Sequence, residues 1–231
     1  CMMLGLTQDY FTPFLLLLGG NAIQVGLMSA AANFMSAFVQ MKSPDFAARA
    51  GSRKKIVTFF VLLQGLMLIP MIYLAVSKTN EPYVMILLMM MFTACGAITV
   101  PPWGSMMSDL VPSSKRGRYF GWRNRVLGFI MVGFSLLTGA VLSAMKKVDI
   151  YYGFAIVFFL ASVARIISWR FLEKMHEPRL VYKKEDHFTI FDFVKGMKKR
   201  NFARFVLFVA LMNFCVFIAS PFFSVLMIRD L

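Results

Sequence analysis

One carboxylate stands inside the first apolar stretch of the sequence. Residues 1–20 read CMMLGLTQDYFTPFLLLLGG, and Asp9 lies near the middle of this run. A charged side chain at the centre of a bilayer costs at least ~2.5 kcal/mol, so an acid in this position is usually functional. Asp9 is therefore a candidate for binding a cation, a proton or a polar solute. The alternative is a structural carboxylate that is hydrogen-bonded to neighbouring helices.

Other polar or amphipathic side chains also lie inside apolar runs. They are Gln8, Asn33, Trp103, Arg165 and Asn213. Arg165 is the base deepest within such a run, and it either extends its side chain towards the nearer end of the helix or pairs with Asp9. Together with Asp9, these residues are the candidates for binding a solute or a coupling ion.

The sequence offers little material for catalysis. His176 and His187 lie in one polar segment, and the cysteines at 1, 95 and 215 are widely spaced. Neither paired intramembrane carboxylates nor a cluster with the spacing of metal ligands is apparent. We therefore predict that the protein is not an enzyme and carries no metal or other cofactor.

Composition places the protein in a membrane. The chain has 231 residues, of which 59% are hydrophobic, and its mean hydropathy is +0.69. A transmembrane helix needs about 20 apolar residues, and none of the apolar runs alternates strictly as a strand of a β-barrel would. We therefore predict an all-α integral membrane protein with seven spans, at residues 2–19, 22–41, 56–76, 83–106, 126–145, 153–172 and 205–228.

The positive charges indicate how these spans are oriented. Lys and Arg cluster in segments 42–55, 115–125 and 173–204, whereas segments 20–21, 77–82 and 146–152 hold at most two each. Because cytoplasmic loops are enriched in Lys and Arg, the basic segments are predicted to be cytoplasmic, in the plasma membrane of a bacterium. The net charge of +14 therefore reflects topology, and the predicted partner is the lipid bilayer rather than a nucleic acid.

The predicted organisation has three parts. Residues 1–172 form a transmembrane bundle, residues 173–204 a central cytoplasmic loop, and residues 205–231 one further helix. Within the loop, Ile190, Phe193, Val194 and Met197 follow helical spacing beside several lysines, which predicts an amphipathic helix on the membrane surface. The chain opens on Cys1 inside an apolar run and stops just after its last span, so we expect it to be a fragment of a longer protein.

The amino-acid sequences of two basic loops are distinctive. The sequence from Asp109 to Gly121 places Pro112, Arg116 and Gly117 before the fifth span, which resembles the link between helices four and five in the major facilitator superfamily. The loop before the third span is similar to the pattern G-x-x-x-D-R-x-G-R-R-K of that superfamily. The matching residues are Arg49, Gly51, Arg53 and Lys54, with Ala48 at the Asp position and Asp45 as its candidate substitute.

The resemblance implies a secondary active transporter. Members of this superfamily have two six-helix bundles and bind a small solute near the midplane between them, where access alternates between the two sides. The chain would then comprise the first bundle and helix seven, with a proton or sodium ion as the coupling ion. The fifth span lacks the Gly-Pro pair of the proton-coupled drug antiporters, which disfavours that class. A non-transporting membrane receptor or scaffold with the same fold remains the alternative.

Overall fold

The computed structural model describes residues 1–178 and 201–229, with the side chains of residues 1–178, 204–222 and 225–226. The chain divides into two units, residues 1–180 and residues 181–231. The predicted amphipathic helix within the central loop lies outside the described residues. Unit 1 contains α1 (Met2–Thr7), α2 (Phe11–Leu17), α3 (Ala22–Ala50), α4 (Arg53–Leu66), α5 (Leu68–Ser77), α6 (Pro82–Leu110), η1 (Ser113–Lys115), α7 (Arg116–Met145) and α8 (Ile150–Glu173).

Most of the described chain is helical, as its apolar runs predict. Segments long and apolar enough to cross a membrane are Ala22–Ala50, Arg53–Ser77, Pro82–Leu110, Ser113–Met145, Ile150–Glu173 and Arg204–Phe222. The protein is therefore an all-α, multi-pass integral membrane protein. The last segment belongs to unit 2, where α10 (Asn201–Arg229) is a long helix with almost all of its described side chains exposed.

The first predicted span is not one continuous helix. It consists of α1 and α2, which are separated at Gln8–Tyr10, where Tyr10 has φ −106° and ψ −5°. Pro13 explains the interruption, because its nitrogen has no hydrogen to donate to the carbonyl oxygen of Asp9. Proline is tolerated within the first turn of a helix, so α2 begins just before it. The break therefore falls at the carboxylate that the sequence singles out.

A second proline coincides with another interruption. α4 ends at Leu66 and α5 begins at Leu68, so the third span is broken at Met67. Pro70 cannot donate to the carbonyl of Leu66, which accounts for the position of the break. Pro101 and Pro102 lie inside α6, which continues through them to Leu110.

Several helices are longer than the hydrophobicity pattern predicts. Residues 42–50 and 116–125, which we assigned to loops, are the last turns of α3 and the first turns of α7. Their polar side chains do not prevent helix formation, because a helix can continue beyond the hydrocarbon layer. Gly51 ends α3 in the left-handed conformation, with φ 63°, as is common for a glycine that follows a helix.

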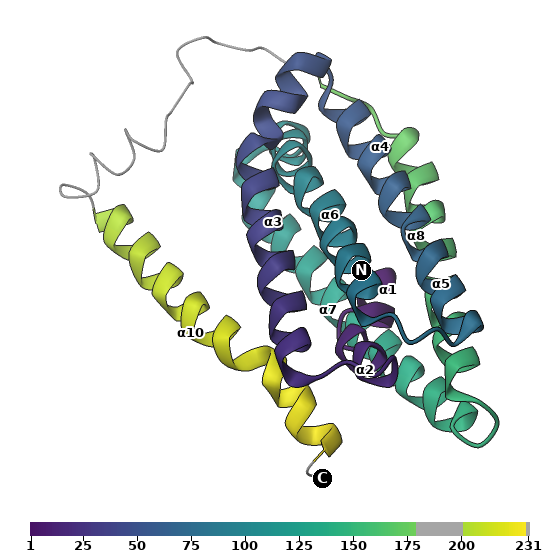
Figure 1. Cartoon of the computed structure of the whole chain (residues 1–231). Helices are drawn as coiled ribbons and strands as arrows, with labels where there is room; N and C mark the ends of the chain where they lie inside the picture. The colour runs from purple at the N-terminus through teal and green to yellow at the C-terminus, as the bar shows by residue number, and fades with distance from the viewer. Residues whose placement is uncertain (179–200, 230–231) are drawn as a thin grey trace. The chain divides into compact units, whose positions relative to one another are not determined.

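Unit 1 is held together by extensive packing between helices. α3 packs along α6, α4 and α5 pack against α8, and α1 contacts both α7 and α8 (Figure 1). The core includes an aromatic cluster in which the ring of Phe14 lies 5.0 Å from those of both Phe154 and Phe158, and Phe11 lies 5.4 Å from Phe92. The short α2 is therefore anchored in the core although it has fewer than two full turns beyond Pro13.

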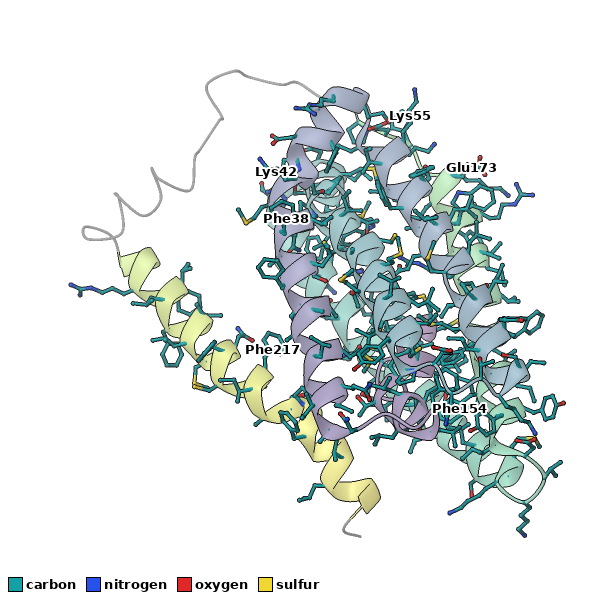
Figure 2. The ribbon with its side chains drawn as sticks, in the orientation of Figure 1. Phe38, Lys42, Lys55, Phe154, Glu173 and Phe217 are labelled. Carbon is teal, nitrogen blue, oxygen red and sulfur yellow. The ribbon has the colours of Figure 1, made fainter. Side chains whose placement is uncertain are left out.

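The two ends of unit 1 differ in charge. We call the end that carries the α3–α4 and α6–α7 connections the basic end, and the end with the α2–α3, α5–α6 and α7–α8 connections the opposite end. Figure 2 shows Lys42, Lys55 and Glu173 towards the basic end and Phe154 towards the opposite end. At the opposite end Lys78 forms an ion pair with Asp149. The hydrogen bond that the Lys78 ammonium donates lowers the pKa of the Asp149 carboxyl.

Large apolar side chains cover the outside of unit 1. Phe34 and Phe129 are each 75% exposed, on α3 and α7 respectively, and Thr138 is the single buried residue of α7. Phe38 on α3 likewise points away from the bundle in Figure 2. Such surfaces suit contact with lipid or with further membrane helices rather than with water.

Candidate functional site

Asp9 lies in the break between α1 and α2, on the surface of unit 1. Both Asp9 and Gln8 are exposed. The hydroxyl of Ser135 on α7 donates a hydrogen bond of 3.2 Å to Oδ2 of Asp9, and the hydroxyl of Tyr10 donates one of 2.7 Å to the carbonyl oxygen of Ser135. The non-helical turn is thus tied to α7 at one position. The second carboxylate oxygen of Asp9 has no partner among the described residues.

Close packing brings α1 against α7. A Cβ atom added at Gly5 would lie 2.7 Å from the carbonyl oxygen of Met131, so a glycine is required for the two backbones to approach. The hydroxyl of the buried Thr138 donates 2.9 Å to the carbonyl of Phe134, one turn earlier on α7, rather than remaining unpaired. Gly5 therefore sets the spacing at which Ser135 reaches Asp9.

A half-open cavity of about 620 Å³ lies between α1, α4, α6, α7 and α8 in unit 1, and Cys1, the first residue of the sequence, borders it. Its wall includes Trp103, Arg123 and Arg165, together with the neutral polar side chains of Gln64, Thr93, Thr99 and Ser168. The guanidinium of Arg123 stacks over the ring of Trp103, with 4.3 Å between its central carbon and the ring centroid. Two of the predicted site residues, Trp103 and Arg165, thus share one cavity.

Arg165 is bound by a neutral partner and not by Asp9. Its Nη2 donates to Oε1 of Gln64, whose own Nε2 donates 3.1 Å to the carbonyl oxygen of Phe92. Nε of Arg165 is buried and has no hydrogen-bond partner among the described residues. The ion pair with Asp9, which the sequence left open, is absent from the described part of the chain, because Asp9 turns to Ser135 on α7.

The remaining candidates do not join either group. Asn33 is exposed on α3, and among the described residues it neither forms a hydrogen bond with Asp9 nor lines the cavity. Asn213 belongs to α10 in unit 2, where its side chain is exposed and donates 2.8 Å to the carbonyl oxygen of Val209. That bond within one helix satisfies the amide group locally.

A network of polar contacts closes the basic end. The side chain of Arg53 is buried, and its Nη1 donates to Oδ2 of Asp109 at 2.6 Å and to Oγ of Ser105 at 2.8 Å. Its Nη2 donates 3.2 Å to the carbonyl oxygen of Pro178. Arg53 therefore joins the start of α4, the end of α6 and the segment that follows α8.

Glu177 completes this network at the start of α4. Its carboxylate accepts hydrogen bonds from Oγ of Ser52 at 2.6 Å and from the backbone nitrogen of Lys54 at 3.1 Å. A carboxylate at a helix N-terminus also interacts favourably with the helix dipole. Partial burial raises the pKa of the Glu177 carboxyl. The hydrogen bonds and the charge of Arg53 together lower it by more than burial raises it, so the pKa lies below the ordinary value of 4.5.

The other motif residues have local structural contacts. Arg116 donates from Nε to the carbonyl of Val111 at 3.1 Å and from Nη2 to that of Ser108, which satisfies acceptors at the end of α6. Gly117 has open space around the position of a Cβ atom. Asp45 and Arg49 are exposed on the last turns of α3, and Asp45 has no ion pair among the described residues, where Arg53 instead binds Asp109.

Sequence reasoning missed several participants. Gln64 carried a usable signal, because it is a large polar residue within the apolar run FVLLQGLML. Ser135 and Glu177 carried none, since one is a small residue common in membrane helices and the other an ordinary acid in a polar segment. Their roles arise only from which helices lie next to one another.

The sequence of the chain was compared with protein families, curated proteins and solved structures. The family model described as Major Facilitator Superfamily matches residues 1–231. The chain belongs to the Major Facilitator Superfamily. Searches of curated proteins and of solved structures gave no match to the chain. Membership makes this protein a transporter of that superfamily, whose members act on small solutes, and the all-α bundle agrees with it.

We expect the two partners of the Arg53–Asp109 pair in this superfamily member to respond unequally to mutation. Asp109→Ala leaves the buried guanidinium of Arg53 without its carboxylate and should cost about 1–3 kcal/mol of unfolding free energy. Arg53→Met removes the buried charge but keeps much of the volume, and should cost less than Asp109→Ala, because the Asp109 side chain is 48% exposed. Thermal unfolding in detergent measures both variants. Equal losses would contradict the asymmetry.

A pH dependence is expected from Glu177. Because the pKa of its carboxyl is lower in the folded protein, its docking stabilises the protein above the ordinary pKa of 4.5 and is lost as the pH falls through the lowered value. Between pH 7 and pH 3, Glu177→Gln should therefore lose less stability than the wild type. Melting temperatures across this range, with Glu173→Gln as the exposed control, test this. Parallel curves for the wild type and Glu177→Gln would contradict it.

Proposed function

We propose that the protein is a secondary active transporter that moves a small solute across the membrane by alternating access. In this proposal residues 1–172 form the first helical bundle, residues 173–204 are the central cytoplasmic loop, and residues 205–231 are the first helix of the second bundle. The basic end of unit 1 faces the cytoplasm, in the plasma membrane of a bacterium. The clustering of Lys and Arg at that end supports this orientation.

The exposure of Asp9 within the first span is the observation that carries the proposal. A carboxylate in the middle of a span is not stable against lipid tails, so the face that bears it requires either water or other protein. Asp9 lies on the outside of unit 1 beside the exposed Gln8, and its Oδ2 is held by Ser135 while its other oxygen has no partner among the described residues. That face suits a water-accessible path between two bundles.

The helix break adds chemical capacity to this position. Where a membrane helix is interrupted, polar backbone groups near the break are available to ions and solutes, and transporters of several folds bind their cargo at such points. Here a carboxylate, a hydroxyl and an amide side chain surround the turn, from Asp9, Ser135 and Gln8. We propose that Asp9 binds the coupling ion, a proton or a sodium ion, or a polar group of the solute. Asn33 is proposed to contribute to the same path, and Asn213 of unit 2 stays by itself a candidate for binding the solute or the coupling ion.

Flux through the full-length protein tests this function. A proton or sodium gradient is imposed across the membrane of proteoliposomes that contain the protein. Isotopically labelled carboxylates, phosphates, amines and sugars are then added outside, one at a time. A secondary active transporter accumulates at least one of them, and accumulation stops when an ionophore collapses the gradient. A receptor or scaffold of the same fold would bind a ligand without moving it, and the absence of flux for the entire panel would count against transport.

A further inference from the structure

We infer that the parts of α3 and α6 nearest the basic end, residues 44–50 and 99–110, turn as one body about a hinge at Ser43 and Pro102. We call these two segments the basic-end arm. The inference goes beyond the proposed function, because it names a moving part within unit 1 and the residue that couples its two helices. It starts from the hydroxyl of Ser43, which is fully buried and donates a hydrogen bond to the carbonyl oxygen of Ile98.

Pro102 explains why this carbonyl is available. In an uninterrupted helix the carbonyl oxygen of Ile98 would accept from the backbone nitrogen four residues later, but the nitrogen of proline carries no hydrogen. A carbonyl without a donor is costly inside a membrane, and serine side chains of neighbouring helices are among the groups that replace the missing donor. Ser43 of α3 thus supplies to α6 the hydrogen bond that Pro102 removes.

Both helices are weakened at the same level. Pro44 follows Ser43 directly and lies inside α3, where it removes the hydrogen bond to the carbonyl oxygen of Gln40. Pro101, beside Pro102, removes a second hydrogen bond from α6. Neither helix ends at its prolines, and α3 packs along α6 (Figure 1). Each helix can therefore bend most easily where it is bonded to the other.

The far ends of the basic-end arm are also tied together. Arg53 begins α4, directly after the turn that ends α3, and its guanidinium donates to Oδ2 of Asp109 and to Oγ of Ser105 near the end of α6. Between the two ties, Ala47 and Met106 are buried. Segments that are joined at both ends and packed along each other are expected to move together and not to slide past one another.

Such a hinge changes the basic end of unit 1 without unfolding either helix. Hinges in proteins are a few residues that absorb most of the change in backbone angles, while the parts on either side keep their structure. The hydroxyl of Ser43 can rotate with the bend and stay bonded to the carbonyl of Ile98, so the bend exposes no unpaired group there. In a transporter, bending of this kind would contribute to closing and opening one side of the protein.

A double-mutant cycle in the full-length protein tests the coupling of Ser43 to Pro102. Ser43→Ala leaves the carbonyl of Ile98 without a donor and should lower the melting temperature in detergent by about 2–10 °C. In the Pro102→Ala background the backbone nitrogen of Ala can donate to the same carbonyl, so Ser43→Ala should cost less than half as much. Ser43→Thr keeps the hydroxyl and should stay close to the wild type. Equal losses in both backgrounds would overturn the inference.

Pro101→Ala and Ser36→Ala are the matched controls for the cycle. A backbone donor restored at Pro101 faces a different carbonyl, so the loss from Ser43→Ala should persist in that background. Ser36 lies two turns before Ser43 on α3 and takes no part in the bond to Ile98, so Ser36→Ala should leave the melting temperature unchanged. Equally strong coupling of Ser43 to both prolines would refute its role as the donor that replaces Pro102.

Distances between spin labels test the motion itself. The full-length protein without its native cysteines is placed in lipid nanodiscs, and introduced cysteines carry the labels. One pair, Phe46→Cys with Leu110→Cys, lies within the basic-end arm, and the other, Phe46→Cys with Phe171→Cys, joins the arm to α8. All three positions are exposed. We expect one narrow distance for the first pair and a broad or two-peaked distribution for the second, which becomes narrow in Pro102→Ala.

Two results would overturn the hinge. One is a single distance for the second pair that Pro102→Ala leaves unchanged. The other is a first pair that varies as much as the second, because the two segments would then move separately. If Pro102→Ala does not fold, Pro44→Ala stiffens α3 at the same level and should narrow the second distribution in its place. Pro44 is exposed, so this variant should fold normally.

Flux measurements separate the hinge from the proposed function. The melting temperatures and the label distances require no solute, so they judge the hinge even if the protein transports nothing. Absence of flux would refute the proposed function alone. If a solute is accumulated, Pro102→Ala should slow its initial rate of uptake without lowering the melting temperature. Uptake by Pro102→Ala at the wild-type rate would show that transport does not use this hinge and would overturn its role.

Discussion

Asp9→Asn in the full-length protein is expected to reduce gradient-driven uptake about tenfold to hundredfold. The substitution keeps the size of the side chain and its ability to accept from Ser135, but removes the negative charge. A hydrogen bond to a charged group is worth ~1.5–3 kcal/mol, and every 1.4 kcal/mol corresponds to tenfold. Initial rates of uptake into proteoliposomes, measured from pH 5 to pH 9, give both the size of the effect and the change in pH dependence.

Two further variants show whether the effect belongs to this site. Ser135→Ala removes the side-chain donor to Asp9 that the described residues supply, and should alter the pH profile less than Asp9→Asn does. Asp149→Asn makes the same chemical change at the opposite end of unit 1, in the pair with Lys78, and should leave transport near the wild-type rate. An Asp9→Asn protein with normal uptake and an unchanged pH profile would show that Asp9 is only structural.

The second large effect is expected for Gly5→Ala, which should lower the unfolding free energy by about 1–3 kcal/mol. The added Cβ would meet the carbonyl oxygen of Met131 at 2.7 Å and its Cα at 3.1 Å, both of them backbone atoms that cannot rotate away. The α1 and α7 helices must then separate, which is the usual cost of overpacking. Thermal or denaturant unfolding in detergent measures this loss.

Gly128→Ala on α7 is the matched control for this prediction. Nothing lies within 4 Å of the position of its Cβ atom, and alanine is preferred to glycine within a helix by about 1 kcal/mol. Gly128→Ala should therefore be neutral or stabilising. If both variants lose the same stability, the close approach of α1 and α7 is not what Gly5 provides.

The fold class follows directly from the sequence because it depends on simple physical quantities. Each apolar run is long enough to cross the hydrocarbon layer, and a helix is the way to satisfy its backbone there. The exact ends of the helices are harder to predict from the sequence, because hydrophobicity marks where the lipid ends and not where the helix ends. The last turns of α3 and the first turns of α7 were therefore assigned to loops.

The break at Asp9 shows what a hydropathy reading overlooks. The hydrophobicity of residues 2–19 predicts one continuous span. Pro13 nevertheless removes a backbone hydrogen bond, and the helix begins again at Phe11. The signal was present in the sequence, but its meaning depends on whether neighbouring helices can satisfy the freed groups. Tyr10 and Ser135 join the turn to α7 through side-chain hydrogen bonds, and the bond between them spans 125 residues of sequence, which no local pattern encodes.

The partners of the polar residues could not be predicted from the sequence either. Asp9 and Arg165 are the acid and the base that lie furthest inside apolar runs of the sequence, which made a direct pair a natural hypothesis. In the structure Asp9 accepts from Ser135 on α7, whereas Arg165 on α8 donates to Gln64 on α4. By contrast, Arg53 and Asp109 were found because a loop motif contains them, although their pairing with one another came from the structure. Motif residues are recognisable from sequence, whereas their contacts depend on the packing of α4, α6 and α8.

The central claim is that the break in the first span is reached from both sides of the membrane in turn. Gln8, which is exposed beside Asp9, is the reporter position. In a full-length protein lacking its native cysteines, Gln8→Cys is labelled with a membrane-impermeant maleimide from either face of right-side-out or inverted vesicles. We predict labelling from both faces, with a transported solute or an ion gradient shifting the balance between them. Labelling from one face alone under all conditions, or from neither, would contradict alternating access at this site.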